Sequence, residues 1–296
     1  LVAPSFGPFI AEQSTEETRG RVFALTEMIF TVVTIIGPPL GGWLVDTYGF
    51  KFMLLVAGVL YTLATIIRVI MARNLAGSQP SNPQNLTFKA LGSNLKLMAG
   101  MFLGGGLLTW ILVTDGVRDI SFAASFNLMP VYLEDIGKLS VQQIGWLSSV
   151  FGIASLAVNW LGGWLADHKG ERVPISLGFL LVGAAIILFV EVDTYLGFIL
   201  SWALFGAGVG LLSPSYNSLM SKAIPEKIRG TAFGLLSTSL GLFSLPAPAI
   251  GAQLWERISP QFPFQITAGV TLLTIIPIWL KFKLPKTEAV KPEEAA

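Results

Sequence analysis

The sequence contains no cysteine, a single histidine and few charged residues for its length. Without cysteine, the chain can form neither a disulfide nor a thiolate metal site. Charged residues make up 12% of the chain, whereas a soluble domain carries about 25%. The net charge of +1 gives no indication of nucleic-acid binding. No phosphate loop, metal-ligand spacing or nucleophile motif is found, so the sequence predicts no ATP site, no metal, no cofactor and no enzyme.

What the sequence has in quantity is apolar residues, which make up 53% of the chain. A soluble domain of this length could not hide so much apolar surface. Runs of about 20 apolar residues are long enough to cross a lipid bilayer as helices. We therefore predict an all-α integral membrane protein with about eight transmembrane helices, at 22–45, 51–72, 105–134, 142–166, 173–191, 196–221, 229–255 and 263–282.

Two of these runs are copies of one pattern. Residues 229–255 repeat residues 19–45 at a constant offset of 210 and without a gap. The aligned identities include Arg19 with Arg229, Gly20 with Gly230, Phe23 with Phe233, Pro38 with Pro248, and Gly41 with Gly251. A duplicated membrane span predicts a transporter that is built from repeated groups of helices.

Lysine and arginine accumulate in one of the two alternating sets of loops. This set includes Arg68, Arg73, Lys169 and Arg172, together with the tail after residue 283. Because basic residues accumulate on the cytoplasmic side of a membrane, we expect this set and the C-terminus to be cytoplasmic. The predicted location is the plasma (cell inner) membrane, which the chain crosses several times.

Two short motifs carry a resemblance to a known family. The block GGWLADHKGER at 162–172 resembles the Gly-x-Leu-Ala-Asp-Arg-x-Gly-Arg-Arg loop motif of the major facilitator superfamily, and it departs from that motif at His168 and Glu171. The block GPPLGG at 37–42 resembles the motif that ends the family's fifth helix and is frequent in its proton antiporters. The matching residues are Gly163, Leu165, Ala166, Asp167, Gly170 and Arg172 in the loop, and Gly37, Pro38, Gly41 and Gly42 at the helix end.

The resemblance implies a twelve-helix fold made of inverted three-helix repeats, of which this chain would hold the end of helix four and helices five to twelve. The segment GGWLVDTYG at 41–49 resembles GGWLADHKG at 162–170 on the opposite side of the membrane, as inverted repeats require. The expected divisions are the remainder of an N-terminal half (1–73), a central cytoplasmic linker (74–104), a six-helix C-terminal half (105–283) and a cytoplasmic tail (284–296). An interfacial helix and a plain loop remain alternatives within the linker.

The resemblance also implies a function: secondary transport of a small molecule across the lipid bilayer by alternating access, with a proton as the candidate coupling ion and antiport or efflux as the candidate mode. ATP and nucleic acid are not expected partners. The alternative is a membrane sensor or scaffold that keeps the fold without transporting. Charges inside a membrane span argue against that alternative, because each is costly to insert.

The third predicted span contains such charges. Asp115, Arg118 and Asp119 fall near its middle, where each costs about 2.5–3.5 kcal/mol to insert, so we expect them to pair and to face a cavity. Arg118 would either bind an anionic part of the solute, with a carboxylate exchanging a proton, or belong to a structural ion pair; a third possibility places the charges among cytoplasmic headgroups. The candidate cavity residues are Asp115, Arg118, Asp119, Phe122, Phe126, Tyr216 and Asn217.

The loop motif supplies a second hypothesis. Asp167 follows a helix end, from which its carboxylate could accept hydrogen bonds from the first amides of a neighbouring helix, where the helix dipole favours an anion. A contact of this kind, made in one conformation and broken in another, would act as a gate. The alternative is a solvated loop carboxylate.

Overall fold

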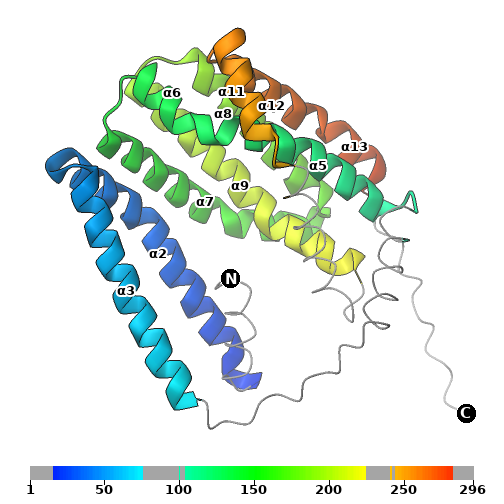
Figure 1. Cartoon of the computed structure of the whole chain (residues 1–296). Coiled ribbons are helices and arrows are strands. Elements are labelled where there is room, and N and C mark those ends of the chain that lie inside the picture. The colour runs from blue at the N-terminus through cyan, green and yellow to red at the C-terminus, as the bar shows by residue number, and fades with distance from the viewer. Residues whose placement is uncertain (1–15, 76–99, 101–103, 225–240, 242–243, 283–296) are drawn as a thin grey trace, which may run out of the picture.

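The computed structural model describes residues 16–75, 100, 104–224, 241 and 244–282, and the elements assigned within them are helices (Figure 1). In chain order these are α2 (Glu16–Tyr48), α3 (Phe50–Leu75), α5 (Leu107–Ser125), the short 3-10 helix η1 (Phe126–Leu128), α6 (Met129–Asp135), α7 (Val141–Lys169), α8 (Arg172–Glu191), α9 (Tyr195–Ala223), α11 (Ala247–Arg257), α12 (Phe262–Leu273) and α13 (Ile275–Lys281).

Six stretches of the described residues are long and apolar enough to cross a membrane. They are Ile29–Tyr48, Phe50–Met71, Val141–Lys169, Arg172–Glu191, Tyr195–Ala223 and Phe262–Lys281. Each coincides with one of the eight runs predicted from the sequence. The predicted span 229–255 lies partly outside the described residues, as does nearly all of the linker 74–104 and all of the tail 284–296.

The remaining predicted span, 105–134, is helical but is not one uninterrupted helix. It divides into α5, η1 and α6, and the prediction of a single run was wrong in that respect. Pro130 is the physical reason, because proline has no N–H to donate to the carbonyl of Phe126, four residues earlier. Pro277 stands in the same relation to Leu273, where α12 ends and α13 follows.

The helices α5 to α13 form one bundle, and α2 and α3 lie beside it as a pair, with α2 against α7 (Figure 1). Aromatic side chains fill the core at one end of the bundle. Tyr132, Phe189 and Phe264 are at most 2% exposed, and their ring centroids lie 4.7–5.3 Å apart. This cluster joins α6, α8 and α12, and α12 in turn packs against α5.

Helices α7 and α9 approach each other closely because α9 presents glycine to α7. A Cβ atom on Gly210 would lie 2.4 Å from the carbonyl oxygen of Ser155, and one on Gly206 would lie 2.3 Å from that of Phe151. Small residues provide close contact between helices in lipid. There the hydrophobic effect does not drive helices together, because lipid tails are as apolar as the side chains. The distance between the two backbones therefore depends on these glycines.

We expect the substitution Gly210→Ala to destabilise the protein by about 1–3 kcal/mol, because the added methyl group must push the two backbones apart. Gly163→Ala on α7 is the matched control, since a Cβ there meets nothing within 4 Å. Thermal unfolding of the purified protein in detergent measures both. Equal melting temperatures for the two variants would contradict the packing argument.

Candidate functional site

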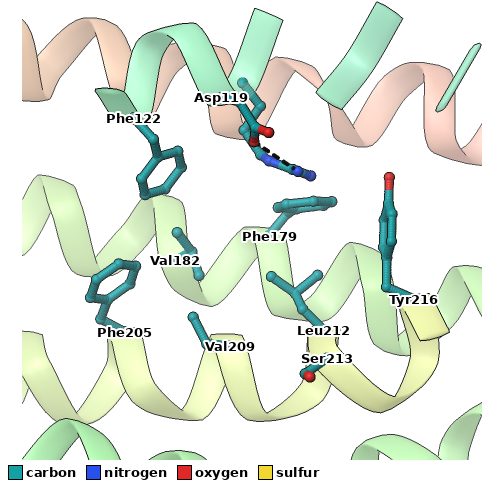
Figure 2. Close-up of a pocket in the computed structure, with 10 residues that line it drawn as sticks. Asp119, Phe122, Phe179, Val182, Phe205, Val209, Leu212, Ser213 and Tyr216 are labelled. Atoms are coloured by element: carbon teal, nitrogen blue, oxygen red, sulfur yellow. Dashed lines mark hydrogen bonds and ion pairs between the residues drawn. The ribbon is translucent and has the colours of Figure 1, made fainter. Parts of the chain in front are cut away.

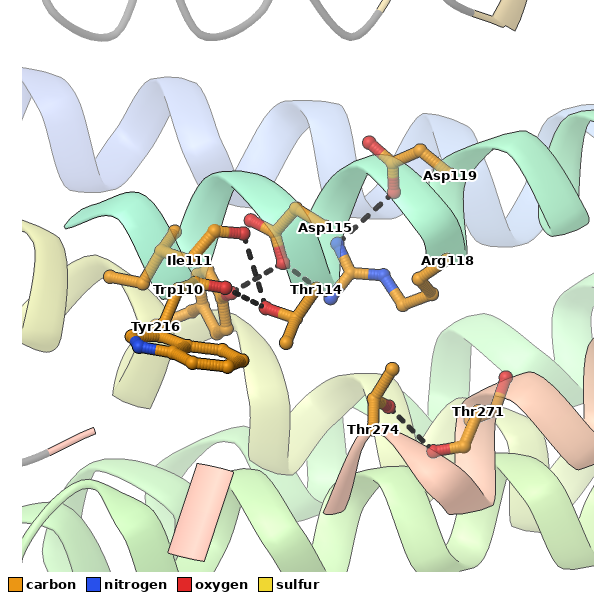
Figure 3. Close-up of polar contacts among 9 residues, drawn as sticks. All are labelled: Trp110, Ile111, Thr114, Asp115, Arg118, Asp119, Tyr216, Thr271 and Thr274. Carbon is orange, nitrogen blue, oxygen red and sulfur yellow. Dashed lines mark hydrogen bonds and ion pairs between the residues drawn. The ribbon is translucent and has the colours of Figure 1, made fainter. Parts of the chain in front are cut away.

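Three charged side chains of α5 form one ion-paired cluster (Figure 3). Arg118 lies between the two carboxylates: its Nη1 is 3.0 Å from Asp115 Oδ1, and its Nη2 is 3.1 Å from Asp119 Oδ1. The three residues come together because spacings of three and four put side chains on the same face of a helix. Each of the two terminal guanidinium nitrogens therefore has its own carboxylate.

The two carboxylates differ in their surroundings. The side chain of Asp115 is 4% exposed, and its Oδ1 also accepts a hydrogen bond of 2.5 Å from the Tyr216 hydroxyl on α9. The side chain of Asp119 is 35% exposed, and among the described residues it forms a hydrogen bond and an ion pair with Arg118 alone. Asp115 is thus fixed in place, whereas Asp119 has free acceptor capacity.

The guanidinium of Arg118 is enclosed as well as paired. Its Cζ lies 5.1 Å from the centre of the Phe179 ring and 5.8 Å from that of Tyr216. Aromatic faces attract a cation, and the attraction is stronger where water is excluded. With one guanidinium and two carboxylates, the cluster carries one excess negative charge when both acids are ionised.

A cavity of about 260 Å³ opens beside the cluster (Figure 2). Its walls are mainly apolar and aromatic, and Figure 2 places Phe122 and Phe205 at one end and Tyr216 at the other. Such a pocket, with a few convergent polar groups, has the features of a small-molecule site. The lining residues are Arg118, Asp119, Phe122, Phe179, Val182, Phe205, Val209, Leu212, Ser213 and Tyr216.

The structure brings together most of the residues that the sequence placed in a cavity. Asp115 contacts Arg118 but does not itself line the cavity, and Phe126 and Asn217 are exposed and do not line it either. Phe126 begins the 3-10 turn, where the α-helical register that places Phe122 is lost. Asn217 follows Tyr216 on α9, and neighbouring side chains of a helix point in different directions.

The apolar walls from α8 and α9 could not be recognised in the sequence. Phe179 and Phe205 lie within long hydrophobic runs, in which a cavity-lining side chain has the same pattern as one that faces lipid. The usable signals were the polar residues of α5 and Tyr216 of α9. Among the described residues, no group of three or more His, Asp or Glu side chains is arranged to hold a metal ion.

The glycines of the two motifs divide into those that make contact and those that do not. Gly42 lies against α7, whereas a Cβ on Gly37, Gly41 or Gly163 would meet nothing within 4 Å. Gly170 ends α7 with a φ of +80°, which favours glycine. Asp167 is exposed, and no hydrogen bond or ion pair joins it to another described residue. Its role as a gate therefore stays a hypothesis.

The acidic and the basic residue that follow Gly170, Glu171 and Arg172, each contact a neighbouring helix. Arg172 donates from Nε to the carbonyl of Phe282, beyond the end of α13. Glu171, one of the two departures from the family motif, is buried at the start of α8. Its Oε1 lies 2.5 Å from Lys222 Nζ and 3.1 Å from Ser218 Oγ, both on α9. The departure thus joins α8 to the end of α9.

We expect the Glu171 contact to make stability depend on acidity. Burial acts to raise the pKa of this carboxyl, but the Lys222 ammonium and the Ser218 hydroxyl more than offset burial, so the pKa lies below its ordinary value of 4.5. A carboxyl whose pKa is lowered by folding stabilises the folded state at any pH above its ordinary pKa. That stabilisation is lost as the pH falls through the lowered pKa.

Thermal unfolding of the wild type and of Glu171→Gln, measured between about pH 7 and pH 3, tests this dependence. The stability difference between the two proteins should be largest at neutral pH and should shrink below about pH 4.5. A difference that stays constant over this range would contradict an ionised Glu171 in the contact.

A family model described as Major Facilitator Superfamily matches residues 1–116 and 116–296 of the chain. Quinolone resistance protein NorA of Staphylococcus aureus (strain MRSA252) is 26% identical over 149 residues, which cover 50% of this chain and 38% of that relative. The chain thus spans well under half of the length of that relative. A multi-drug resistance efflux pump PmrA homolog of Lactococcus lactis subsp. lactis (strain IL1403) is 24% identical over 291 residues, covering 95% of this chain and 68% of the relative.

Among solved structures, the crystal structure of a D-xylose-proton symporter resembles the fold, with a TM-score of 0.59. The match covers 95% of this chain and 67% of the symporter at 16% sequence identity. This likeness concerns the arrangement of the helices alone, because so low an identity carries no information about the solute.

Proposed function

The chain belongs to the major facilitator superfamily, and from this premise we propose that it works as a secondary active transporter, which exchanges a small amphipathic cation for a proton by alternating access. Proteins of this family are transporters rather than enzymes. The proposal rests chiefly on one observation: an ion-paired cluster with one excess negative charge lies in the wall of an aromatic cavity.

The charge balance of the cluster supports a cation as the solute. Arg118 already has two carboxylate partners, so an anionic solute would have to displace one of them. A cation instead finds Asp119, which is partly exposed, and the faces of Phe122 and Tyr216, which attract positive charge. The apolar remainder of the cavity favours a solute with a hydrophobic body.

The same balance supports exchange with a proton. A proton on Asp119 and a cation beside Asp119 each neutralise the single excess charge, and binding of one therefore weakens binding of the other. Asp115 is less suited to this role, because Arg118 and Tyr216 both hold its carboxylate away from the cavity. Mutual exclusion of two ligands at one site is the requirement for antiport.

The direction of transport is proposed from the relatives, whose names describe drug resistance and efflux. We propose outward movement of the cation across the plasma membrane, driven by inward movement of the proton. The distribution of Lys and Arg among the loops supports a cytoplasmic C-terminus.

Transport by the full-length protein, including any residues that precede Leu1, tests the proposal. In proteoliposomes, we expect a proton gradient to drive accumulation of tetraphenylphosphonium beyond that in protein-free liposomes, and a collapsed gradient to abolish this difference. Tetraphenylborate has the same shape and the opposite charge, and its accumulation should be the same with and without the protein. Binding without any gradient-driven movement would favour the sensor or scaffold alternative.

A further inference from the structure

Helices α2 and α7 make their closest contact at one end. The two helices run antiparallel, so that Gly42 near the end of α2 faces Gln142 at the start of α7. A Cβ on Gly42 would lie 2.6 Å from the Cα of Gln142, and a Cβ on Gly145 would lie 2.5 Å from the carbonyl oxygen of Pro38. Figure 1 shows the two helices meeting at this end.

A carboxylate of α2 caps the start of α7 at this end. The amide of Gln142 donates a hydrogen bond of 3.1 Å to Asp46 Oδ2. The first amides of a helix have no partner within the helix, and the helix dipole favours an anion beside them. The capping box of α7, formed by Ser140 and Gln143, satisfies two other amides. Asp46 of α2 therefore supplies the acceptor for the Gln142 amide that the capping box does not.

A second hydrogen bond joins the two helices further along. Ser149 of α7 donates from its hydroxyl to the carbonyl of Ile35 in α2. That carbonyl is available because Pro39, four residues later, has no N–H to offer it. An unpaired carbonyl away from water is costly, so the proline makes α2 dependent on a donor from outside. Ser149 is that donor.

Toward their other ends the two helices separate. A cavity of about 260 Å³ lies between them there, lined from α2 by Phe30, Thr31 and Thr34 and from α7 by residues including Ser155 and Asn159. Contact at one end and a cavity at the other give the pair a closed side and an open side. The open side is the one on which the loop charges place the cytoplasm.

We propose that Asp46 and Ser149 form a latch that holds the outer ends of α2 and α7 together in this conformation and that must release before solute can leave to the outside. The latch rests on the proposed alternating-access function. Asp46 corresponds to Asp167 in the two similar segments 41–49 and 162–170, so the capping role that the sequence assigned to Asp167 is filled, on the opposite side, by its counterpart.

Thiol labelling of the full-length protein tests the latch without requiring transport. Val45→Cys, at a position that is 9% exposed next to Asp46, reports access from outside with a membrane-impermeant thiol reagent. Asn159→Cys reports access at the open end. The chain itself has no cysteine to interfere.

Adding Asp46→Ala or Ser149→Ala should increase labelling at position 45 and decrease it at position 159. The loss of one hydrogen bond corresponds to about a two- to tenfold change in the ratio of the two states. Asp46→Asn keeps an acceptor for the Gln142 amide but loses the charge, so its effect should be intermediate.

Each variant has a matched control. Ser148→Ala removes the neighbouring hydroxyl, which bonds to Ile144 in its own helix, and Asp193→Asn removes an exposed carboxylate from the loop at the same end of the bundle. Neither should change the labelling. The latch is refuted if Asp46→Ala and Ser149→Ala label like their controls. Changed labelling in a protein that accumulates no solute would support the latch and reject the proposed function.

Discussion

Asp119→Asn is expected to abolish pH-driven accumulation of a cationic solute and to weaken its binding about ten- to hundredfold, the effect of losing one interaction with a charged group. The substitution leaves Arg118 paired with Asp115 and the cluster without an excess charge. Neither a proton nor a cation then has a charge to neutralise. Transport in proteoliposomes and binding in detergent measure the two effects.

The fold should tolerate this change, because Asp119 is partly exposed and Arg118 keeps its other carboxylate. Asp115→Asn is the informative comparison. It removes the same charge from the cluster, but it also takes a partner from both Arg118 and Tyr216, so its melting temperature should fall below that of Asp119→Asn. If Asp119→Asn transports with the pH dependence of the wild type, Asp119 does not carry the proton.

Arg118→Met is expected to have the largest effect on folding. It removes the positive charge but keeps much of the apolar volume, and it leaves Asp115 at 4% exposure without its ion-pair partner. Breaking a buried ion pair by removing one partner costs about 3–5 kcal/mol. We therefore expect little folded protein and a strongly lowered melting temperature.

The double variant Arg118→Met with Asp115→Asn should recover most of that stability, because no buried charge is left unpaired. It also keeps one negative charge, on Asp119. If Arg118 serves to hold Asp115, the double variant should still bind tetraphenylphosphonium. If Arg118 recognises an anionic group of the solute, the double variant should fold and yet fail to bind any solute of the wild type.

The sequence was sufficient for six membrane spans of the described residues and for the grouping of the charged residues of the site. Long apolar runs predict membrane spans reliably, because a bilayer sets their minimum length. Asp115, Arg118 and Asp119 were recognisable because charge within such a run is costly, and their spacings place them on one helical face.

The sequence was not sufficient to predict contacts that depend on which helices pack against one another. Phe179 and Phe205 have no pattern that distinguishes a cavity wall from a lipid-facing surface. Phe126 was assigned by continuing the helix past Ser125, but the chain there turns into a 3-10 helix ahead of Pro130. The similarity of 41–49 to 162–170 marks Asp46 as the counterpart of Asp167. Its contact with the start of α7 could not be predicted, because the sequence does not show where α7 lies relative to α2.

The most direct test of the central claim counts protons that are released when a cation binds to the purified full-length protein. Tetraphenylphosphonium binding, measured by calorimetry in buffers of different ionisation enthalpy from about pH 8 down to the most acidic pH at which the protein stays folded, gives this number. We expect each bound cation to displace at most one proton, the number released to rise as the pH falls, and no proton to leave in Asp119→Asn. Cation binding that releases no proton at any pH in this range would contradict competition for a single charge.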